Sequence, residues 1–228
     1  MDEISIRPIA RIRTDFSSKF GIPRQSNLVC ELEGVIVFEN EFRNSDTIKG
    51  LEDFSYLWLI FGFSECIKEN WKATVNPPKL DKTKRKGVFA TRAPYRPNPL
   101  GLSSVKILKI ENDDKLGPLI YVSGADLLDN TPIYDIKPYL KYVDSHIDAT
   151  NGFAEEYVEK RLEVVFPEDL FEMIPMEKRV ALKKVLSLDP RPSYMKYKDR
   201  RYGIEFAGFD VRFYVNDNVL NVCEVERL

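Results

Sequence analysis

The sequence predicts a mainly β fold, a sheet or barrel that is followed by a small α+β unit. β-Branched and aromatic residues form runs of strand length, and clusters of Gly, Pro, Asn and Asp separate these runs. The hydrophobic content of 43% in 228 residues is enough for a packed core. The predicted strands of the N-terminal part are Ile4 to Arg13, Leu28 to Phe38, Leu57 to Phe63, Val105 to Glu111 and Leu119 to Asp126.

Two short helices are predicted among these strands. One covers Asp46 to Phe54, with Ser45 or Asp46 as its N-cap, although Gly50 is unfavourable inside a helix. The other covers Glu65 to Trp71.

A second unit is predicted to begin near Asn151 and Gly152, which places the domains at residues 1–152 and 153–228. Its predicted helix carries Leu182, Val185 and Leu186 on one face. Asn216 to Asn218 suits a tight hairpin between two strands. The predicted elements are a strand at Tyr157 to Phe166, a helix at Met176 to Leu188, and strands at Gly203 to Val215 and Val219 to Glu226.

Charge and composition limit the classes of function. The net charge of −2 and pI of about 5.7 give no global basic field, so any attraction for nucleic acid has to be local. The N-terminus lacks the cationic and apolar regions of a signal peptide, and the apolar run Tyr56 to Phe63 is too short for a bilayer. We therefore expect a cytoplasmic protein whose three cysteines are reduced core thiols.

Several common chemistries have no support in the sequence. The only histidine is His146 and no cysteine pair has ligand spacing, which argues against a zinc site and against Ser-His-Asp or Cys-His catalysis. A metal site built from carboxylates alone is open but unsupported. No phosphate-binding GxxxxGK[ST] or GxGxxG motif is present, and strands and helices do not alternate as in a Rossmann fold.

Four polar segments rich in proline are candidates for binding. Proline fixes φ, so a segment of this kind loses less conformational entropy when it holds a ligand. The alternative for each is an ordinary rigid loop with solvated arginines. The segments are Asp15 to Gln25, Gly87 to Ile107, Asp129 to Tyr139 and Asp189 to Tyr194.

Three of these segments together resemble the TsaA/YaeB-like family, also called TrmO. The matching stretches are Pro23-Arg24-Gln25, the run from Gly87 to Ser103, and Asp135-Ile136-Lys137-Pro138-Tyr139. The resemblance covers roughly residues 5–145, and the run from Gly87 to Ser103 is the most specific part. The segment from Asp189 to Tyr194 resembles the small C-terminal domain of bacterial members.

The resemblance implies an S-adenosylmethionine-dependent tRNA methyltransferase on a β-barrel unlike the Rossmann methyltransferases. The implied substrate is the N6 atom of N6-threonylcarbamoyladenosine beside the anticodon. No metal is implied, because an in-line methyl transfer needs none. The implied assembly is a homodimer with the site near the subunit interface, and the candidate contact residues are Trp58, Ile60 and Phe61, or Tyr95 and Leu100. The alternative for the first three is burial in the core of one subunit.

The resemblance also assigns residues to the cofactor. S-adenosylmethionine offers an adenine to stack, a carboxylate that needs a cation, and a sulfonium that does not tolerate a nearby lysine. Relatives often carry His at the position of Ser64, so this contact departs from the family pattern. The implied cofactor residues are Pro23, Arg24, Gln25, Phe63, Ser64, Arg92, Leu102, Asp129, Asn130, Thr131 and Pro132.

The target nitrogen shares its lone pair with a carbonyl, so a base has to remove its proton as the methyl group arrives. We rank Asp135 first, before Tyr139, Asp129 and the threonyl carboxylate of the substrate. The alternative for Asp135 is a salt bridge with Lys137 that braces the segment. The predicted substrate contacts are Lys86, Arg96, Lys137 and Tyr139.

Two further regions can be interpreted either as RNA-binding or as ordinary structural residues. The basic run Lys82 to Lys86 is either a local tRNA-facing patch or a solvated loop. Tyr194, Tyr197 and Tyr202, which lie among lysines and arginines, either stack on tRNA or belong to the core and rim of a small fold.

Two rival functions stay open at this level. The first is a non-enzymatic barrel that binds a nucleotide-like metabolite or RNA. The second is an S-adenosylmethionine methyltransferase with another substrate. Methyl transfer from labelled cofactor to tRNA separates both from the main hypothesis.

Overall fold

The computed structural model describes residues 3–66, 71–77, 84–157, 161–191 and 200–228. The chain forms two compact units. The first, here called the barrel unit, consists of Met1–Arg13, Gly34–Ser123 and Asn130–Leu140. The second, here called the helix–sheet unit, consists of Thr14–Glu33, Gly124–Asp129 and Lys141–Leu228.

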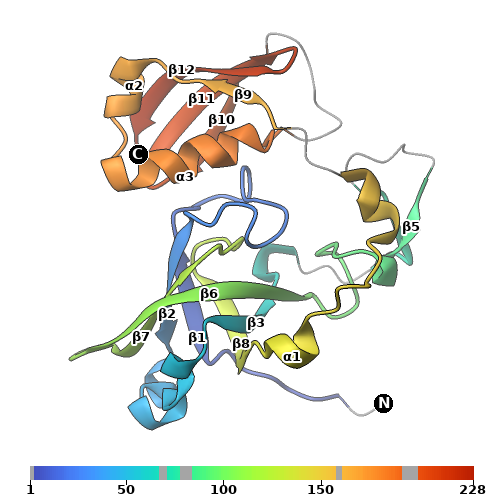
Figure 1. Ribbon diagram of the computed structural model, residues 1–228, viewed down its shortest axis with the longest axis vertical. Helices are drawn as coiled ribbons and strands as arrows, with labels where there is room; N and C mark the ends of the chain where they lie inside the picture. Colours follow the sequence, from blue (N-terminus) through green and yellow to red (C-terminus); the bar gives the residue numbers. More distant parts are fainter. Residues whose placement is uncertain (1–2, 67–70, 78–83, 158–160, 192–199) are drawn as a thin grey trace. The chain divides into compact units, whose positions relative to one another are not determined.

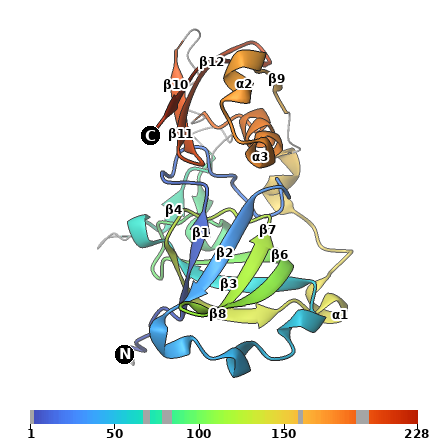
Figure 2. The ribbon, with the colours of Figure 1, turned by 90° about the vertical axis from the view of Figure 1, so that its left-hand side faces the viewer.

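The barrel unit is a closed six-stranded barrel with the strand order β1-β2-β7-β6-β3-β8 (Figures 1 and 2). Closure pairs every strand of the barrel on both sides, so no strand edge is left to template aggregation. The barrel is therefore the β-fold that the sequence predicts. Its strands are β1 (Ala10–Thr14), β2 (Glu33–Phe38), β3 (Tyr56–Gly62), β6 (Leu100–Asp113), β7 (Gly117–Ser123) and β8 (Thr131–Pro138).

Strand β3 shows why these residues form a strand. Leu57 and Leu59 are fully buried and Phe61 nearly so, whereas the alternate residues Trp58 and Ile60 are partly exposed. Successive side chains of a strand point to opposite faces, so this alternation fills the barrel interior from one face. Phe61 belongs to the core, which corrects its assignment to a subunit contact.

Strand β8 corrects the prediction of a loop over Asp129 to Tyr139. It pairs with β1 and with β3, and Pro132 sits opposite Arg11. Ile60 faces Asp135 and Phe61 faces Ile133, so Tyr134 is an extra residue at a register shift. A bulge of this kind re-aims side chains and lets a strand carry residues that usually break one.

The barrel loops contain short elements. Gly50 has φ 85°, and this left-handed residue divides the helix predicted for Asp46 to Phe54 into two 3₁₀ turns. Asn44, rather than Ser45 or Asp46, caps the first turn by accepting a hydrogen bond from the Asp46 amide. The elements are η1 (Asn40–Phe42), η2 (Ser45–Ile48), η3 (Leu51–Asp53), η4 (Ser64–Cys66), β4 (Thr74–Val75), β5 (Lys86–Gly87) and η5 (Val88–Ala90). Residues 67–70 of the second predicted helix lie outside the described residues.

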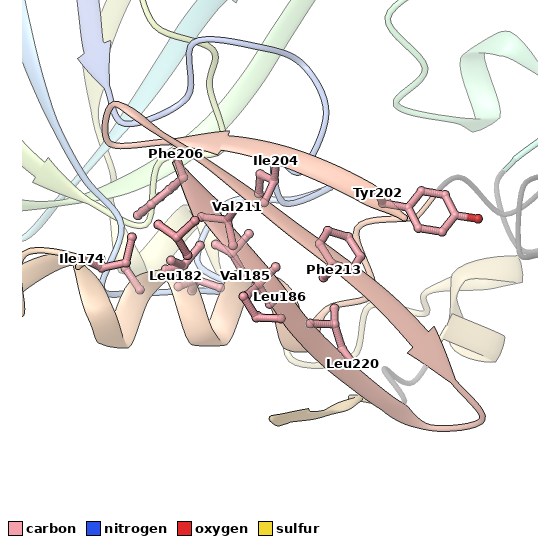
Figure 3. Close-up of a cluster of buried hydrophobic side chains, with 14 of the residues drawn as sticks. Ile174, Leu182, Val185, Leu186, Tyr202, Ile204, Phe206, Val211, Phe213 and Leu220 are labelled. Carbon is pink, nitrogen blue, oxygen red and sulfur yellow. The ribbon is translucent and has the colours of Figure 1, made fainter. Parts of the chain in front are cut away.

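The helix–sheet unit is a four-stranded sheet, order β10-β11-β12-β9, packed against helix α3. Leu182, Val185 and Leu186 of α3 point toward the sheet, as their helical spacing predicts (Figure 3). Its elements are α1 (Lys141–Asp144), η6 (Gly152–Tyr157), β9 (Glu163–Val165), α2 (Glu168–Glu172), α3 (Met176–Ser187), β10 (Tyr202–Phe206), β11 (Phe209–Asn216) and β12 (Val219–Arg227).

The predicted single strand from Gly203 to Val215 is wrong. Ala207 and Gly208 both have positive φ, 51° and 81°, and form a tight turn between β10 and β11. A non-glycine residue rarely adopts this conformation, so Ala207 gives no sequence signal of a turn. The predicted hairpin between β11 and β12 is confirmed.

An N-terminal segment completes the core of this C-terminal unit. Phe16, Val29 and Leu32 are buried in one cluster with residues of α3 and the sheet, and the rings of Phe16 and Phe206 meet edge to face at 5.4 Å. The fold of residues 14–33 therefore depends on residues far along the chain.

The cysteines differ in burial. Cys66 is buried and Cys223 half-buried, but Cys30 is exposed, which corrects its assignment to the core. Among the helices that the structure describes, none has the length and apolar character needed to cross a bilayer.

Candidate functional site

The predicted site residues divide between the two units. The helix–sheet unit contains Pro23, Arg24, Gln25 and Asp129. The barrel unit contains the remaining predicted residues: Phe63, Ser64, Lys86, Arg92, Arg96, Leu102, Asn130, Thr131, Pro132, Asp135, Lys137 and Tyr139.

The loop that carries Pro23, Arg24 and Gln25 begins from a glycine held against the sheet. Gly21 has φ 95°, and a Cβ there would lie 2.2 Å from Cδ1 of Ile204. Only glycine fits this left-handed position and close approach. Pro23 is buried, whereas Arg24 is exposed, so the loop presents a cation next to an anchored proline.

Polar contacts on both sides of this loop tie it to the C-terminal elements. Lys178 Nζ lies 2.7 Å from Asp15 Oδ2, and the Ala207 amide donates to the Asp15 carbonyl at 2.8 Å. Lys184 donates to Glu31 and thereby lowers the pKa of that carboxyl below its ordinary value. The loop is thus fixed by helix α3 and the β10–β11 turn.

Asp129 braces the same unit. Its amide donates to the Phe16 carbonyl at 2.8 Å, and its Oδ1 accepts from the Thr14 amide at 3.0 Å. These contacts favour a structural role for this carboxylate over the role of a base, for which Asp129 is one of the alternatives to Asp135.

In the barrel unit, the end of β3 and the start of β6 approach closely because two glycines lack side chains. A Cβ on Gly101 would lie 2.2 Å from the Phe61 ring, and one on Gly62 would lie 2.7 Å from the Tyr134 ring. The Phe63 amide donates to the Pro99 carbonyl at 2.8 Å. The predicted residues Phe63 and Ser64 therefore lie beside the start of β6, two residues before Leu102.

The loop from Thr91 to Pro99 is braced mainly by its own groups. Thr91 Oγ1 donates to the Val88 carbonyl at 2.9 Å and accepts from the Ala93 amide at 3.3 Å. Arg96 Nη1 donates to the Thr91 carbonyl at 3.1 Å, so part of this guanidinium holds the loop rather than a substrate. Arg92 is exposed on the same loop.

Asp135 and Lys137 form the salt bridge that the sequence offers as an alternative, with Nζ 2.9 Å from Oδ2. Oδ1 of Asp135 also accepts from the Ile136 amide at 2.9 Å. The pair is largely exposed, so it contributes little to stability. Tyr139 packs on Trp58 with ring centroids 5.5 Å apart and continues this face of the barrel.

The turn before β8 is fixed by backbone conformation. Asn130 has φ 64°, and its carbonyl accepts from Arg11 Nη1 at 3.1 Å. Thr131 and Pro132 are buried.

Sequence reasoning misses residues that set the backbone geometry around the predicted site residues of the barrel unit. Gly62, Gly101 and Tyr134 determine how closely β3, β6 and β8 approach. The alternation of apolar residues from Leu57 to Phe61 shows which residues of β3 face the barrel interior. Tyr134, in contrast, lies on a bulge that no local sequence pattern predicts.

Other candidates have plain roles or lie outside the site. Tyr202 is buried and stacks on Phe213, which corrects its RNA-stacking interpretation. Arg191 is buried and pairs with Asp189 at 2.7 Å. Lys82, Thr83 and residues 192–199 lie outside the described residues. A hollow of about 560 Å³ lined by α2, α3 and the β10–β11 turn contains none of the predicted site residues.

Two family models match the chain. Residues 11–145 match the tRNA-methyltransferase O N-terminal domain, and residues 159–228 match the TrmO C-terminal domain. The chain is 34% identical to a tRNA (adenine(37)-N6)-methyltransferase of Escherichia coli over 99% of both chains. It is 39% identical to one of Eikenella corrodens over 70% of this chain and 90% of the relative. A crystal structure of TrmO from Pseudomonas aeruginosa superposes with a TM-score of 0.80 and 32% identity, covering 100% of this chain and 98% of that one.

Proposed function

The chain belongs to the tRNA-methyltransferase O family, and from this membership we propose that it is an S-adenosylmethionine-dependent tRNA methyltransferase. Its substrate is N6 of the threonylcarbamoyladenosine at tRNA position 37. The observation that carries the proposal is the similarity over nearly the whole chain to a methyltransferase of this specificity, together with the match of both domains.

The chemistry of the predicted cofactor residues fits S-adenosylmethionine. In the barrel unit, Arg92 is an exposed cation suited to its carboxylate, and the Phe63 ring, edge to face with Phe61 at 5.2 Å, is suited to the adenine or the sulfonium. In the helix–sheet unit, Arg24 is also an exposed cation. When bound, the cofactor supplies an electrophilic methyl group.

We place the proton transfer at Asp135. A carboxylate has about four lone-pair sites, and Lys137 and the Ile136 amide use two of them. The remaining sites can accept the proton of the substrate N6, while Lys137 holds the carboxylate in one orientation. Lys137 is then a positioning residue as well as a contact for a substrate carboxylate or phosphate.

The test is methyl transfer from labelled S-adenosylmethionine to tRNA with and without threonylcarbamoylation. Label that appears only in the threonylcarbamoylated tRNA supports the proposal. Cofactor binding without tRNA label would instead identify a methyltransferase with another substrate. Absence of any transfer, with RNA binding retained, would identify a binding module.

We further propose that two copies pair through the segment from Tyr95 to Leu102. Tyr95, Leu100 and Leu102 are all exposed apolar side chains in this one segment, which is typical of a contact surface. If the paired subunits share a site, mixing Arg92→Ala with Asp135→Ala subunits restores activity that neither has alone. A monomer by sedimentation that retains full activity at nanomolar concentration overturns the shared site.

A further inference from the structure

We infer that Trp71 and Phe89 form a stacking platform for unpaired bases of the tRNA loop that carries the target adenosine. This inference rests on the proposed function and assigns a substrate-binding role to a pair of residues outside the predicted site. The two residues lie at the two ends of the segments that form the short β4–β5 sheet. These segments are here called the aromatic ribbon, which consists of Trp71, Lys72, Thr74–Val75, Lys84–Gly87 and Phe89.

The two rings are exposed and lie close together. Phe89 is 75% exposed and Trp71 is 49% exposed, yet their ring centroids are only 6.4 Å apart, with 35° between the planes. Rings that only filled the core would be buried. An exposed pair held side by side offers flat faces on which a base can stack, and stacking tolerates any base because each has a π-face.

The backbone beneath the rings is fixed. Thr74 pairs with Gly87 and Val75 with Lys86, and the Val88 amide donates to the Ala73 carbonyl at 2.9 Å. Val88 is buried beside the exposed Phe89 and anchors the segment. The platform is therefore held in place before a ligand arrives, which reduces the entropic cost of binding.

The charge of the aromatic ribbon suits RNA. From Trp71 to Phe89 the sequence has six Lys or Arg residues and one Asp, in a chain whose net charge is −2. Among the described residues of the ribbon all the charged side chains are cationic, and Lys72, Lys84 and Arg85 are exposed. Cations interleaved with exposed rings are the pattern by which proteins bind single-stranded nucleic acid.

The experiment measures the affinity of the full-length protein for threonylcarbamoylated tRNA. Trp71→Ala and Phe89→Ala should each raise its Kd roughly 5- to 150-fold, the factor that corresponds to about 1–3 kcal/mol per stacked base. The Kd for S-adenosylmethionine should stay unchanged in both variants. Tyr142→Ala, which removes a ring that is 83% exposed and lies outside the ribbon, is the matched control and should leave tRNA affinity unchanged.

A second measurement reports stacking directly. The chain has two tryptophans, so Trp58→Phe leaves Trp71 as the only indole. A base stacked on Trp71 should quench its fluorescence when tRNA binds, and Phe89→Ala should weaken this quenching. Unchanged tRNA affinity in both alanine variants, with wild-type methyl transfer, overturns the platform while the proposed function stands.

The remaining outcomes are distinct. In one of them, the wild-type protein forms a dimer that the alanine substitutions weaken. If tRNA binding then falls only at concentrations where the variant is monomeric, the rings contact a second copy and the platform is wrong. If the wild-type protein transfers no methyl group to tRNA, the proposed function fails. Quenching of Trp71 by tRNA would in that case still support a base-stacking surface.

Discussion

The barrel unit holds its predicted site residues on its strands and on loops braced by nearby residues, whereas the helix–sheet unit holds Pro23, Arg24 and Gln25 on a loop anchored by residues far along the chain. In the barrel, close packing at Gly62 and Gly101 fixes the strand ends beside Phe63 and Leu102. In the helix–sheet unit, the anchors are Phe16 in the core and Lys178 beside Asp15.

If the Arg24 loop binds the cofactor, this difference predicts that the C-terminal elements affect cofactor binding through the loop that they anchor. Helix α3 and the β10–β11 turn contact the loop segment directly, so a change in the C-terminal core should alter the Arg24 loop without touching a ligand. A change in the barrel should act on the loops after β3 and before β6. The four predictions below test this contrast from the largest expected effect to the smallest.

Phe16→Ala should lower the free energy of unfolding by about 3–5 kcal/mol, because it leaves a cavity in the core that joins residues 14–33 to the sheet. Chemical denaturation measures this change. It should also weaken S-adenosylmethionine binding, although Phe16 is buried away from any ligand. Phe89→Ala also removes a phenyl ring, but from the exposed surface of the barrel unit. Its free energy of unfolding should stay within about 0.5 kcal/mol of the wild-type value. Equal stability losses in the two variants would remove the contrast.

Arg92→Ala should weaken S-adenosylmethionine binding by about 2–3 kcal/mol, the usual loss for a hydrogen bond to a charged group. Calorimetry on the folded variant measures it. Arg227→Ala, which removes an exposed arginine at the end of β12, is the control and should bind as wild type does. An unchanged affinity in Arg92→Ala would show that the barrel loop does not hold the cofactor carboxylate.

Gly101→Ala should cost about 1–3 kcal/mol of stability, because the new methyl group meets the Phe61 ring and forces β3 and β6 apart. Thermal unfolding reports the loss. Gly87→Ala is the matched control: its φ of −57° suits any residue, and nothing lies within 4 Å of the added Cβ. If Gly87→Ala destabilised the protein as much as Gly101→Ala, the clash with the Phe61 ring would not be the cause of the loss.

Lys184→Gln should have the smallest effect, about 0.2–1 kcal/mol at neutral pH, because its pair with Glu31 is partly exposed. Lys184 lowers the pKa of Glu31 below the ordinary 4.5, so the pair stabilises the fold above that pH. The stabilisation should disappear as pH falls through the lowered pKa. Lys183→Gln, on an exposed neighbour, should show no such pH dependence.

The predictable parts of the fold are those with local patterns. Leu57, Leu59 and Phe61 alternate as a strand requires, and the spacing of Leu182, Val185 and Leu186 indicates the helix. Strand β8 escapes prediction because Pro132 and Asp135 are typical of loops, and only pairing with β1 and β3 overrides that preference.

In the candidate site, too, the features with a local sequence pattern are predictable and those that depend on distant residues are not. The run from Gly87 to Ser103 is specific enough to indicate a family, and the Asp135 to Lys137 pair follows from proximity in sequence. The anchoring of residues 14–33 could not be predicted, because no local periodicity records that Phe16 meets Phe206.

The contact of Phe16 with Phe206 also has a consequence for synthesis at the ribosome. Residues 14–33 emerge early, but the strands that bury Phe16, Val29 and Leu32 are among the last to be made. Contacts of such long sequence separation slow folding, since the connecting chain has to be ordered before they form. During translation Phe16, Val29 and Leu32 therefore stay unburied until the last strands are made, and we expect these apolar side chains to be open to non-native contacts in that interval.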